Sequence, residues 1–187
     1  MQIQRMSELD EADFRRLVVG YTSDEVYELA VDESDEAFAF RFERRRREPA
    51  FRKEWPFSPG MFGWYRTLLG LGLSFAAIED GVMRGLVISG TTEWSKLVNV
   101  WELHVEAGHQ GRGIGRALLT SVEAEAANRG YRAVSCEAQN TNVPAIGFYR
   151  RVGYAPLAVD LSFYGNDDIA RGEVSVFMRK AVRPGAA

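Results

Sequence analysis

The sequence predicts an α/β protein of the α+β type, with a mixed and mostly antiparallel sheet. Three observations lead to this prediction. The length of 187 residues and the hydrophobic fraction of 46% suit one domain with a sizeable core. Between Leu73 and Val105, β-rich segments are joined by short turns, which is typical of an antiparallel meander. Helical repeats then alternate with further β-rich segments as far as Lys180, as expected of helices that flank a sheet.

The N-terminal part predicts a short strand, a helix and a hairpin. Ser7 is the expected N-cap of the helix because acidic residues follow it. The hairpin is predicted from Val26–Val31 and from residues 37–45, where phenylalanines alternate with smaller or polar residues and the sequence DESD lies between the two segments. Residues 44–60 are basic, polar and interrupted by proline, so we expect a solvated loop there.

The central part predicts three consecutive strands. Residues 73–78, 82–92 and 97–105 are rich in β-branched and other apolar residues. The sequences EDG and EWSK separate them and are typical of tight turns. We therefore expect these strands to be antiparallel neighbours.

The C-terminal part predicts two helices and three strands. Apolar residues recur every four positions from Gly113 to Arg129, and Gly130 is placed to end that helix. Asn142 is the expected cap of the second helix, with Pro144 in its first turn. The three strands are expected at residues 133–138, 157–164 and 173–180.

Composition excludes several classes of protein. A net charge of −3 and a sequence pI of about 5.5 argue against a general nucleic-acid binder. One cysteine, Cys136, allows no internal disulfide and favours a reducing compartment. The first residues contain no apolar signal core, and the longest apolar stretch, 67–78, is too short to span a bilayer. We therefore expect a cytoplasmic protein without a membrane partner. Two histidines and one cysteine make no convincing metal site.

The sequence HVEAGHQGRGIGRA (104–117) places three glycines where a helix must begin. Free N–H groups and the helix dipole at such a point favour an anion, and glycine lets a ligand approach the backbone. Arg112 and Arg116 add positive charge, so a pyrophosphate fits. The P-loop pattern and the dinucleotide fingerprint both fail here. From spacing alone, a plain strand-to-helix turn explains the glycines equally well.

A second motif, NVPAIGFYRRVGY (142–154), changes that balance. Together the two stretches resemble the GNAT superfamily of acyl-CoA-dependent N-acetyltransferases. The phosphate motif of that family, Gln/Arg-x-x-Gly-x-Gly/Ala, is matched from Gln110 to Gly115. Its later motif is matched at Asn142, Ala145, Phe148 and Tyr149 and by the glycine and tyrosine that follow. The resemblance covers roughly residues 73–180 and implies a sheet whose central strands splay apart in a V.

The resemblance implies a set of residues that hold acetyl-CoA and carry out acetyl transfer to an amine. The backbone of Leu103, His104 and Val105 would pair with the pantetheine arm, and amides from Gln110 to Gly115 would hold the pyrophosphate. The full expected cofactor-binding set is Leu103, His104, Val105, Gln110, Gly111, Arg112, Gly113, Ile114, Gly115, Arg116, Asn142, Ala145, Phe148 and Tyr149.

Three side chains are candidates for proton transfer. The resemblance implies that Tyr149 is the proton donor to the thiolate, and the ordinary pKa values of a phenol and a thiol, about 10 and 8.5, are close enough for that transfer. Glu102 and Glu137 are alternative bases, either of which can also attract a cationic amine. His104 is a relay or a hydrogen-bonded structural residue. A core tyrosine and surface carboxylates are the plainer explanations.

The resemblance also implies an organisation and a substrate class. We expect one domain, 1–187, with a variable substrate side at 1–72 and an acetyl-CoA-binding core at 73–180. A finer similarity to streptothricin acetyltransferases, carried by residues 136–154 and 159–167, favours a small cationic amine as acceptor. A protein or peptide amine and a non-catalytic acyl-CoA sensor stay open as alternatives, as does an acyl group longer than acetyl. Dimers are common in the family, so a homodimer is compatible with the resemblance.

Overall fold

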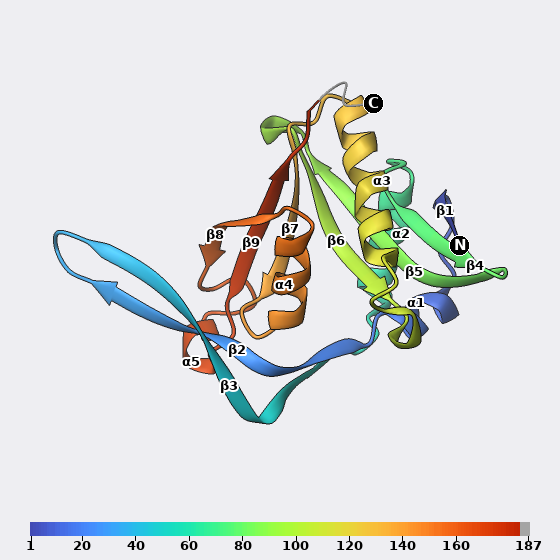
Figure 1. The fold of residues 1–187 in the computed structure, drawn as a ribbon. Coiled ribbons are helices and arrows are strands. Elements are labelled where there is room, and N and C mark those ends of the chain that lie inside the picture. The colour runs from blue at the N-terminus through green and yellow to red at the C-terminus, as the bar shows by residue number, and fades with distance from the viewer. Residues whose placement is uncertain (184–187) are drawn as a thin grey trace. The chain divides into compact units, whose positions relative to one another are not determined.

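The computed structural model describes residues 1–183 and divides them into two compact units, each built from separate parts of the chain (Figure 1). The first unit contains Met1–Val19, Trp55–Cys136 and the described residues from Arg179 on. The second contains Gly20–Glu54 and Glu137–Met178. Two strands, β7 (Ala133–Gln139) and β9 (Ser175–Ala181), continue from one unit into the other.

The first unit is a sheet covered by helices. Its complete elements are β1 (Gln2–Arg5), α1 (Glu11–Leu17), α2 (Pro59–Leu69), β4 (Phe75–Glu79), β5 (Val82–Thr92), β6 (Leu97–Val105) and α3 (Ile114–Asn128), with short 3-10 helices η1 (Glu93–Ser95) and η2 (Ala107–His109). The strand order is β1-β4-β5-β6-β7. All neighbours are antiparallel except β6 and β7, which are parallel. The predicted mixed, mostly antiparallel sheet with flanking helices is thereby confirmed.

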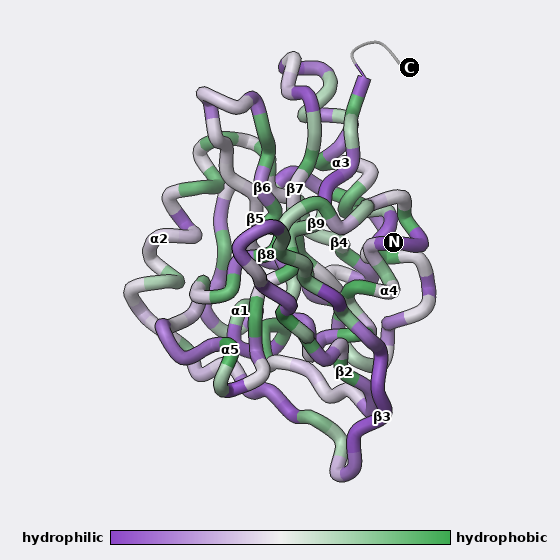
Figure 2. Tube along the Cα trace, turned by 90° about the vertical axis from the view of Figure 1, so that its left-hand side faces the viewer, coloured by the Kyte–Doolittle hydropathy of each residue, from purple (hydrophilic) through white to green (hydrophobic). Residues whose placement is uncertain are grey.

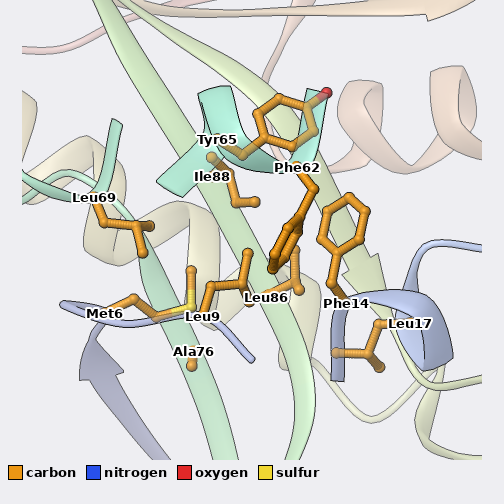
Figure 3. Packing of buried hydrophobic residues seen from close by; sticks show 10 residues of the cluster. All are labelled: Met6, Leu9, Phe14, Leu17, Phe62, Tyr65, Leu69, Ala76, Leu86 and Ile88. Carbon is orange, nitrogen blue, oxygen red and sulfur yellow. The ribbon is translucent and has the colours of Figure 1, made fainter. Parts of the chain in front are cut away.

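The core of the first unit lies where α1 and α2 pack against β4 and β5 (Figure 3). The rings of Phe14 and Phe62 are 5.3 Å apart, and Tyr65 lies 5.8 Å from Phe14. Leu86 and Ile88 of β5 are fully buried beneath them. Each such side chain contributes about 1.5–3 kcal/mol through burial. This packing fixes α2 against the strands that precede the glycine turn.

The second unit combines a long hairpin with the segment after β7. Its complete elements are β2 (Gly20–Glu33), β3 (Phe38–Glu54), α4 (Val143–Arg151), β8 (Ala155–Asp160) and α5 (Asp168–Arg171). Asn140 joins the two parts. Its backbone carbonyl accepts from Tyr27 N–H at 2.9 Å, and its side-chain amide donates to the Tyr27 carbonyl at 2.7 Å and to the Gly172 carbonyl at 3.1 Å. Lys53 Nζ lies 2.6 Å from the carboxylate of Glu173.

Two N-terminal predictions are wrong. The cap of α1 is Asp10, not Ser7, because the Asp10 carboxylate accepts from the amides of Ala12 and Asp13. The expected loop at 44–60 is instead the second half of β3 and the start of α2. The strand continues through its arginines because β2 begins at Gly20 and pairs with β3 as far as Glu54.

Helix α2 follows ordinary start signals inside the region expected to be a loop. The Ser58 hydroxyl accepts from Met61 N–H, and Pro59 occupies the first turn, where its missing N–H costs nothing. Phe62, Tyr65 and Leu69 then bury one face. Part of the aromatic sequence before Leu69 therefore packs in the core.

The predicted helices of the C-terminal half are confirmed, with their caps. Helix α3 ends before Gly130, which has a φ of +76°, and α4 is followed by Gly153 with a φ of +97°. The Asn142 side chain accepts from Ala145 N–H at 3.1 Å and so caps α4. None of the helices within residues 1–183 is long and apolar enough to cross a membrane.

Candidate active site and cofactor-binding turn

The glycine turn connects the end of β6 to α3 through an open stretch of backbone. Gly111 and Gly113 have φ values of +76° and +84°, a region that L side chains rarely adopt. A Cβ atom built at either position meets no other atom within 4 Å. The two glycines are therefore required by the backbone conformation and not by lack of space. The positions where their side chains would lie are open.

The N-terminus of α3 is not closed by a side chain. Its N-cap is Gly113, which accepts from Ala117 N–H at 3.0 Å but has no side chain to receive the first amides of the helix. Ile114 is 2% exposed and anchors this end of a 15-residue helix in the core. First-turn amides without a side-chain cap, together with the helix dipole, favour an anion here.

The charged side chains around the turn are partly engaged. Arg112 pairs with Glu79 at 2.9 Å, while Arg116 is exposed on the first turn of α3. Gln110 Nε2 donates to the Val105 carbonyl at 3.1 Å and so ties the turn to the end of β6. The pairing of Arg112 favours a role in holding the turn over the predicted direct contact with a phosphate.

Just before the turn, Glu106 is the centre of a cluster of ionic contacts. Its carboxylate accepts from Arg84 at 2.7 Å and from Arg16 at 2.6 Å, and it lies 2.9 Å from His109 Nδ1. The Arg84 hydrogen bond, followed by the charges of Arg84, Arg16 and His109, lowers the pKa of Glu106 below its ordinary value. These contacts attach η2 and the glycine turn to α1 and β5.

Strand β6 has one paired edge next to the turn. Glu102, Leu103, His104 and Val105 pair with residues of β5, after a bulge at Trp101. Strand β6 pairs with β7 from Leu97 to Val100, so within the described first unit residues 102–105 have a strand partner on one side. Backbone groups on its other edge can therefore serve a bound ligand. The predicted V-shaped splay involves residues from both units and stays a prediction.

The carboxylate of Glu102 lies between the side chains of Tyr65 and His104, an arrangement that the sequence did not predict. Tyr65 Oη donates to Glu102 Oε1 at 2.7 Å, and His104 Nε2 lies 2.6 Å from Glu102 Oε2. Trp55 stands edge-on to the His104 ring at 5.4 Å. The side chains of Glu102 and His104 are 13% and 12% exposed. Burial, followed by the Glu102 charge, raises the pKa of Tyr65, so its phenol stays a neutral donor.

In the second unit, Tyr149 lies on the buried face of α4. It is 7% exposed, and its ring centroid is 5.4 Å from that of Phe148 and 5.6 Å from that of Tyr154. Asn142, at the start of the same helix, is 9% exposed and acts as its cap. The predicted donor and the predicted cap thus share one short helix, with Ala145 and Phe148 between them.

Glu137 belongs to a largely buried polar cluster in the second unit. Tyr164 Oη donates to Glu137, and Tyr21 Oη is 2.7 Å from Thr141 Oγ1. Burial, followed by the Glu137 charge, raises the pKa of Tyr164, and burial is also the main cause of a raised pKa at Tyr21. Asp160, in the segment that carries the finer resemblance to streptothricin acetyltransferases, accepts from Ser162 N–H at 2.9 Å.

The structure distributes the predicted residues over both units. Glu102, Leu103, His104, Val105 and Gln110–Arg116 belong to the first unit, and Glu137, Asn142, Ala145, Phe148 and Tyr149 to the second. The sequence missed Tyr65 because its segment was not recognised as a helix. Tyr21 was missed because no local spacing connects it to Thr141, whereas Tyr164 lies in the segment 159–167 that carries the finer resemblance.

Comparisons with known proteins agree with these motifs. The model of the acetyltransferase (GNAT) family matches residues 23–154. Streptothricin acetyltransferase of Streptomyces lavendulae is 31% identical over 113 residues, which are 60% of this chain and 56% of that protein. The match therefore spans little more than half the length of this curated relative.

Two solved structures share the fold over nearly the whole chain. The crystal structure of nourseothricin acetyltransferase has a TM-score of 0.75 and 26% identity, covering 96% of this chain and 97% of that one. A Bacillus anthracis protein, provisionally named a streptothricin acetyltransferase and solved with acetyl coenzyme A, has a TM-score of 0.72 and covers 96% of both chains. At 16% identity, the latter likeness concerns the fold alone.

Proposed function

Because the chain belongs to the acetyltransferase (GNAT) family, we propose that it transfers the acetyl group of acetyl-CoA directly to the primary amine of a small cationic molecule. Family membership confirms the resemblance that the sequence predicts. The observation that carries the proposal is the open glycine turn at the N-terminus of α3, directly after a strand with one paired edge. This arrangement suits a ligand that has both a pyrophosphate and an extended amide-containing arm.

The residues of the turn fit the pyrophosphate of the coenzyme. Gly111 and Gly113 leave space where side chains would lie, and the first amides of α3 have no side-chain cap among the described residues. We assign the amides between Gln110 and Gly115 to the phosphates and the backbone of Leu103–Val105 to the pantetheine arm. Arg116, exposed beside the turn, adds positive charge.

Acetyl-CoA supplies a thioester whose C–S bond breaks as the amine nitrogen forms the new C–N bond. An alkylammonium, with an ordinary pKa of about 10.4, must first lose a proton, so the protein needs a base. The departing sulfur must gain a proton, so the protein also needs a donor. The net products are an acetamide and the free thiol, and no oxidant or reductant is required.

We assign the base to Glu102 and the donor to Tyr149. Glu102 lies on β6, immediately before the backbone segment assigned to the coenzyme, and is oriented from both sides by Tyr65 and His104. Tyr149 lies in the helix capped by Asn142, as in the family motif. Glu137 is the alternative base, because the hydrogen bond that it accepts from Tyr164 also holds its carboxylate in place.

Two observations support a cationic acceptor: the names of matching proteins and the negative charge of two partly buried carboxylates. Two of the matching proteins, at 31% and 26% identity, carry the names streptothricin and nourseothricin acetyltransferase. Glu102 and Glu137 supply partly buried negative charge that attracts an ammonium group. We therefore place the acceptor among amines with a second positive charge, in preference to peptide N-termini.

The test is thiol release from acetyl-CoA across a panel of polyamine antibiotics, diamines, aminoglycosides and peptides, with products identified by the mass of one added acetyl group. We expect turnover with cationic small molecules. Turnover with peptides alone would show that the acceptor is a peptide amine and not a small cationic molecule. Tight acetyl-CoA binding by calorimetry, with silence across the panel, would favour a sensor instead of an enzyme.

The assignment of the base has its own test, with a matched control. Glu102→Gln is expected to lower kcat/KM by about 10²-fold or more, within the range of general-base catalysis. Glu93→Gln is the control, because Glu93 also accepts from a tyrosine, Tyr131, but lies in the exposed turn η1. A larger loss in Glu137→Gln than in Glu102→Gln would transfer the role to Glu137.

A further inference from the structure

Exposed aromatic side chains lie beside Glu102 in the first unit. Trp101 of β6 and Trp64 of α2 are 46% and 42% exposed, and their ring centroids are 4.9 Å apart with the ring planes at 80°. The ring of Trp64 is also 5.1 Å from that of Tyr65, whose hydroxyl donates to Glu102. Figure 3 shows this hydroxyl pointing away from the other labelled side chains of the core. Two exposed indoles thus adjoin the tyrosine that holds the proposed base.

The bulge in β6 brings Trp101 and Glu102 to the same face of the sheet. Consecutive side chains of a regular strand point to opposite faces, whereas a bulge re-aims a side chain. Glu102 pairs with Ile88, which is buried in the core beneath α2, and directly opposite residues share a face. Glu102 therefore faces α2. Trp101, the bulged residue, faces α2 as well, because its ring contacts Trp64.

Gly90 of β5 leaves the space that the indole of Trp101 occupies. A Cβ atom built at Gly90 would lie 2.9 Å from Trp101 Nε1 and 3.5 Å from Cδ2 of Leu68 in α2. The φ of Gly90 is not among the positive values, so its backbone conformation does not require glycine. We therefore attribute this glycine to the close approach of the indole.

The two indoles lie on the face of the sheet opposite to α3. Figure 2 shows β5 and β6 between α2 and α3. A Cβ atom built at Gly85 would meet the side chains of Ile114 and Leu118 in α3. Gly90, in contrast, faces α2. A ligand on the α2 face therefore reaches Glu102 without crossing the turn to which the coenzyme phosphates are assigned.

Exposed indoles next to a carboxylate suit an organic cation. The face of an aromatic ring attracts an ammonium group within about 6 Å of its centroid, and tryptophan is the most effective residue for this contact. Two indoles at nearly a right angle offer two such surfaces to one cation. A neutral apolar ligand gains no attraction from Glu102, and an anion is repelled by it.

We propose that Trp64 and Trp101 bind the second positive charge of the acceptor while its reacting amine lies at Glu102. This inference rests on the proposed acetyl transfer and deepens it, because it assigns the preference for dicationic amines to two residues. The indoles determine specificity and take no part in the chemical step. Their contacts persist from the bound substrate to the transition state, so their loss raises KM and leaves kcat nearly unchanged.

The first test needs no acetyl transfer. Choline and its uncharged carbon analogue, 3,3-dimethylbutan-1-ol, have the same shape, and neither has an amine to acetylate. In titrations followed by saturation-transfer NMR, the wild type should bind choline at least threefold more tightly than the alcohol. Trp64→Leu/Trp101→Leu keeps apolar side chains but should bind choline about 3- to 30-fold more weakly, the range expected of cation–π contacts. Trp94→Leu is the control, because Trp94 is 90% exposed but lies in η1.

The second test measures kcat and KM with diamines of increasing chain length and with monoamines of matching length. The wild type should show its lowest KM at one diamine length. Trp64→Leu/Trp101→Leu should lose this preference, with KM for that diamine raised about 3- to 30-fold at nearly constant kcat and little change for monoamines. Trp64→Phe/Trp101→Phe keeps aromatic faces and should restore most of the preference.

A third variant displaces an indole without removing a ring. Gly90→Ala forces the ring of Trp101 to shift, so KM for the preferred diamine should rise. Gly63→Ala is the matched control, because a Cβ atom at Gly63, next to Trp64 in α2, meets no atom within 4 Å. The thermal midpoints of all variants check that they fold.

The outcomes separate this subsite from the acetyl transfer on which it rests. Equal binding of choline and the alcohol by the wild type, or unchanged choline binding by Trp64→Leu/Trp101→Leu, would overturn the subsite. So would a wild-type dimer in sedimentation that the same variant abolishes, since a second copy would then cover the indoles. Diamine turnover with an unaltered KM in this variant would refute the subsite and keep the transfer. Choline binding that depends on the indoles, with no turnover of any amine, would keep the cation site and refute the transfer.

Discussion

Replacing Gly113 by alanine tests the link between backbone conformation and the coenzyme site. Gly113 has φ +84° and ψ +1°, and an added Cβ meets no atom within 4 Å. The cost therefore comes from the left-handed backbone alone, about 1–2 kcal/mol for an L residue. Alanine also reduces the entropy of the unfolded chain, which offsets about 0.4–1 kcal/mol. We expect Gly113→Ala to lower the free energy of unfolding by roughly 0.8 kcal/mol, and by no more than about 1.6 kcal/mol.

Gly108→Ala is the matched control in the same turn. Gly108 also has open space at its Cβ position, and its φ is not among the positive values. This variant should gain the entropic contribution of about 0.4–1 kcal/mol without the strain. In a chain of this length 1 kcal/mol moves the thermal midpoint by roughly 2–4 °C, so calorimetry separates the two variants.

The variant that is less stable, Gly113→Ala, should also bind acetyl-CoA more weakly than Gly108→Ala does. Gly113→Ala places a methyl group beside the amides assigned to the pyrophosphate and should weaken binding, measured by titration calorimetry. Gly108→Ala should bind like the wild type. If Gly113→Ala matched the control in both stability and affinity, neither the left-handed entry to α3 nor its role in phosphate binding would stand.

Three further predictions concern the donor, a buried amide and a surface ion pair. Tyr149→Phe should reduce turnover much more than acetyl-CoA affinity, and unchanged turnover would remove Tyr149 from the donor role. Asn140→Ala should cost about 3 kcal/mol in urea unfolding, because Asn140 is 1% exposed and its loss removes one buried hydrogen bond, to Val174 N–H, and two part-buried ones, to the carbonyls of Tyr27 and Gly172. The hydrogen bond from Arg5, assisted by Arg129, lowers the pKa of Glu125 below its ordinary 4.5, so its stabilisation is complete above that pH and is lost as pH falls through the folded pKa. The thermal midpoints of the wild type and Arg5→Gln should therefore differ at pH 6 and converge toward pH 3, and a constant difference would contradict this.

Local sequence signals correctly predicted the helices and strands whose structure is determined by residues close together in the sequence. The four-residue repeat from Ile114 gave α3, and Asn142 gave the cap of α4, because both depend on neighbours in sequence. The three central strands and their turns were predicted for the same reason.

Elements that depend on distant partners were missed. The arginines of β3 suggest a loop when read alone, and the strand exists because β2 pairs with it along its length. Glu102 was identified from its place before the glycine turn, but its hydrogen bond from Tyr65 joins residues 37 positions apart. No spacing rule connects such residues before α2 is packed on the sheet.

The joining of the hairpin to Asn140 and Glu173 has a consequence for how the chain folds as it is synthesised. Tyr27 and Lys53 emerge from the ribosome long before the residues that bind them, which lie 113 and 120 positions later. Until then the hairpin has no partner within its own unit, and contacts this distant in sequence form slowly because a long loop must close. The nascent chain therefore exposes two strands with apolar and charged faces for most of its synthesis, which makes the interval before Val174 appears the period of greatest risk of aggregation.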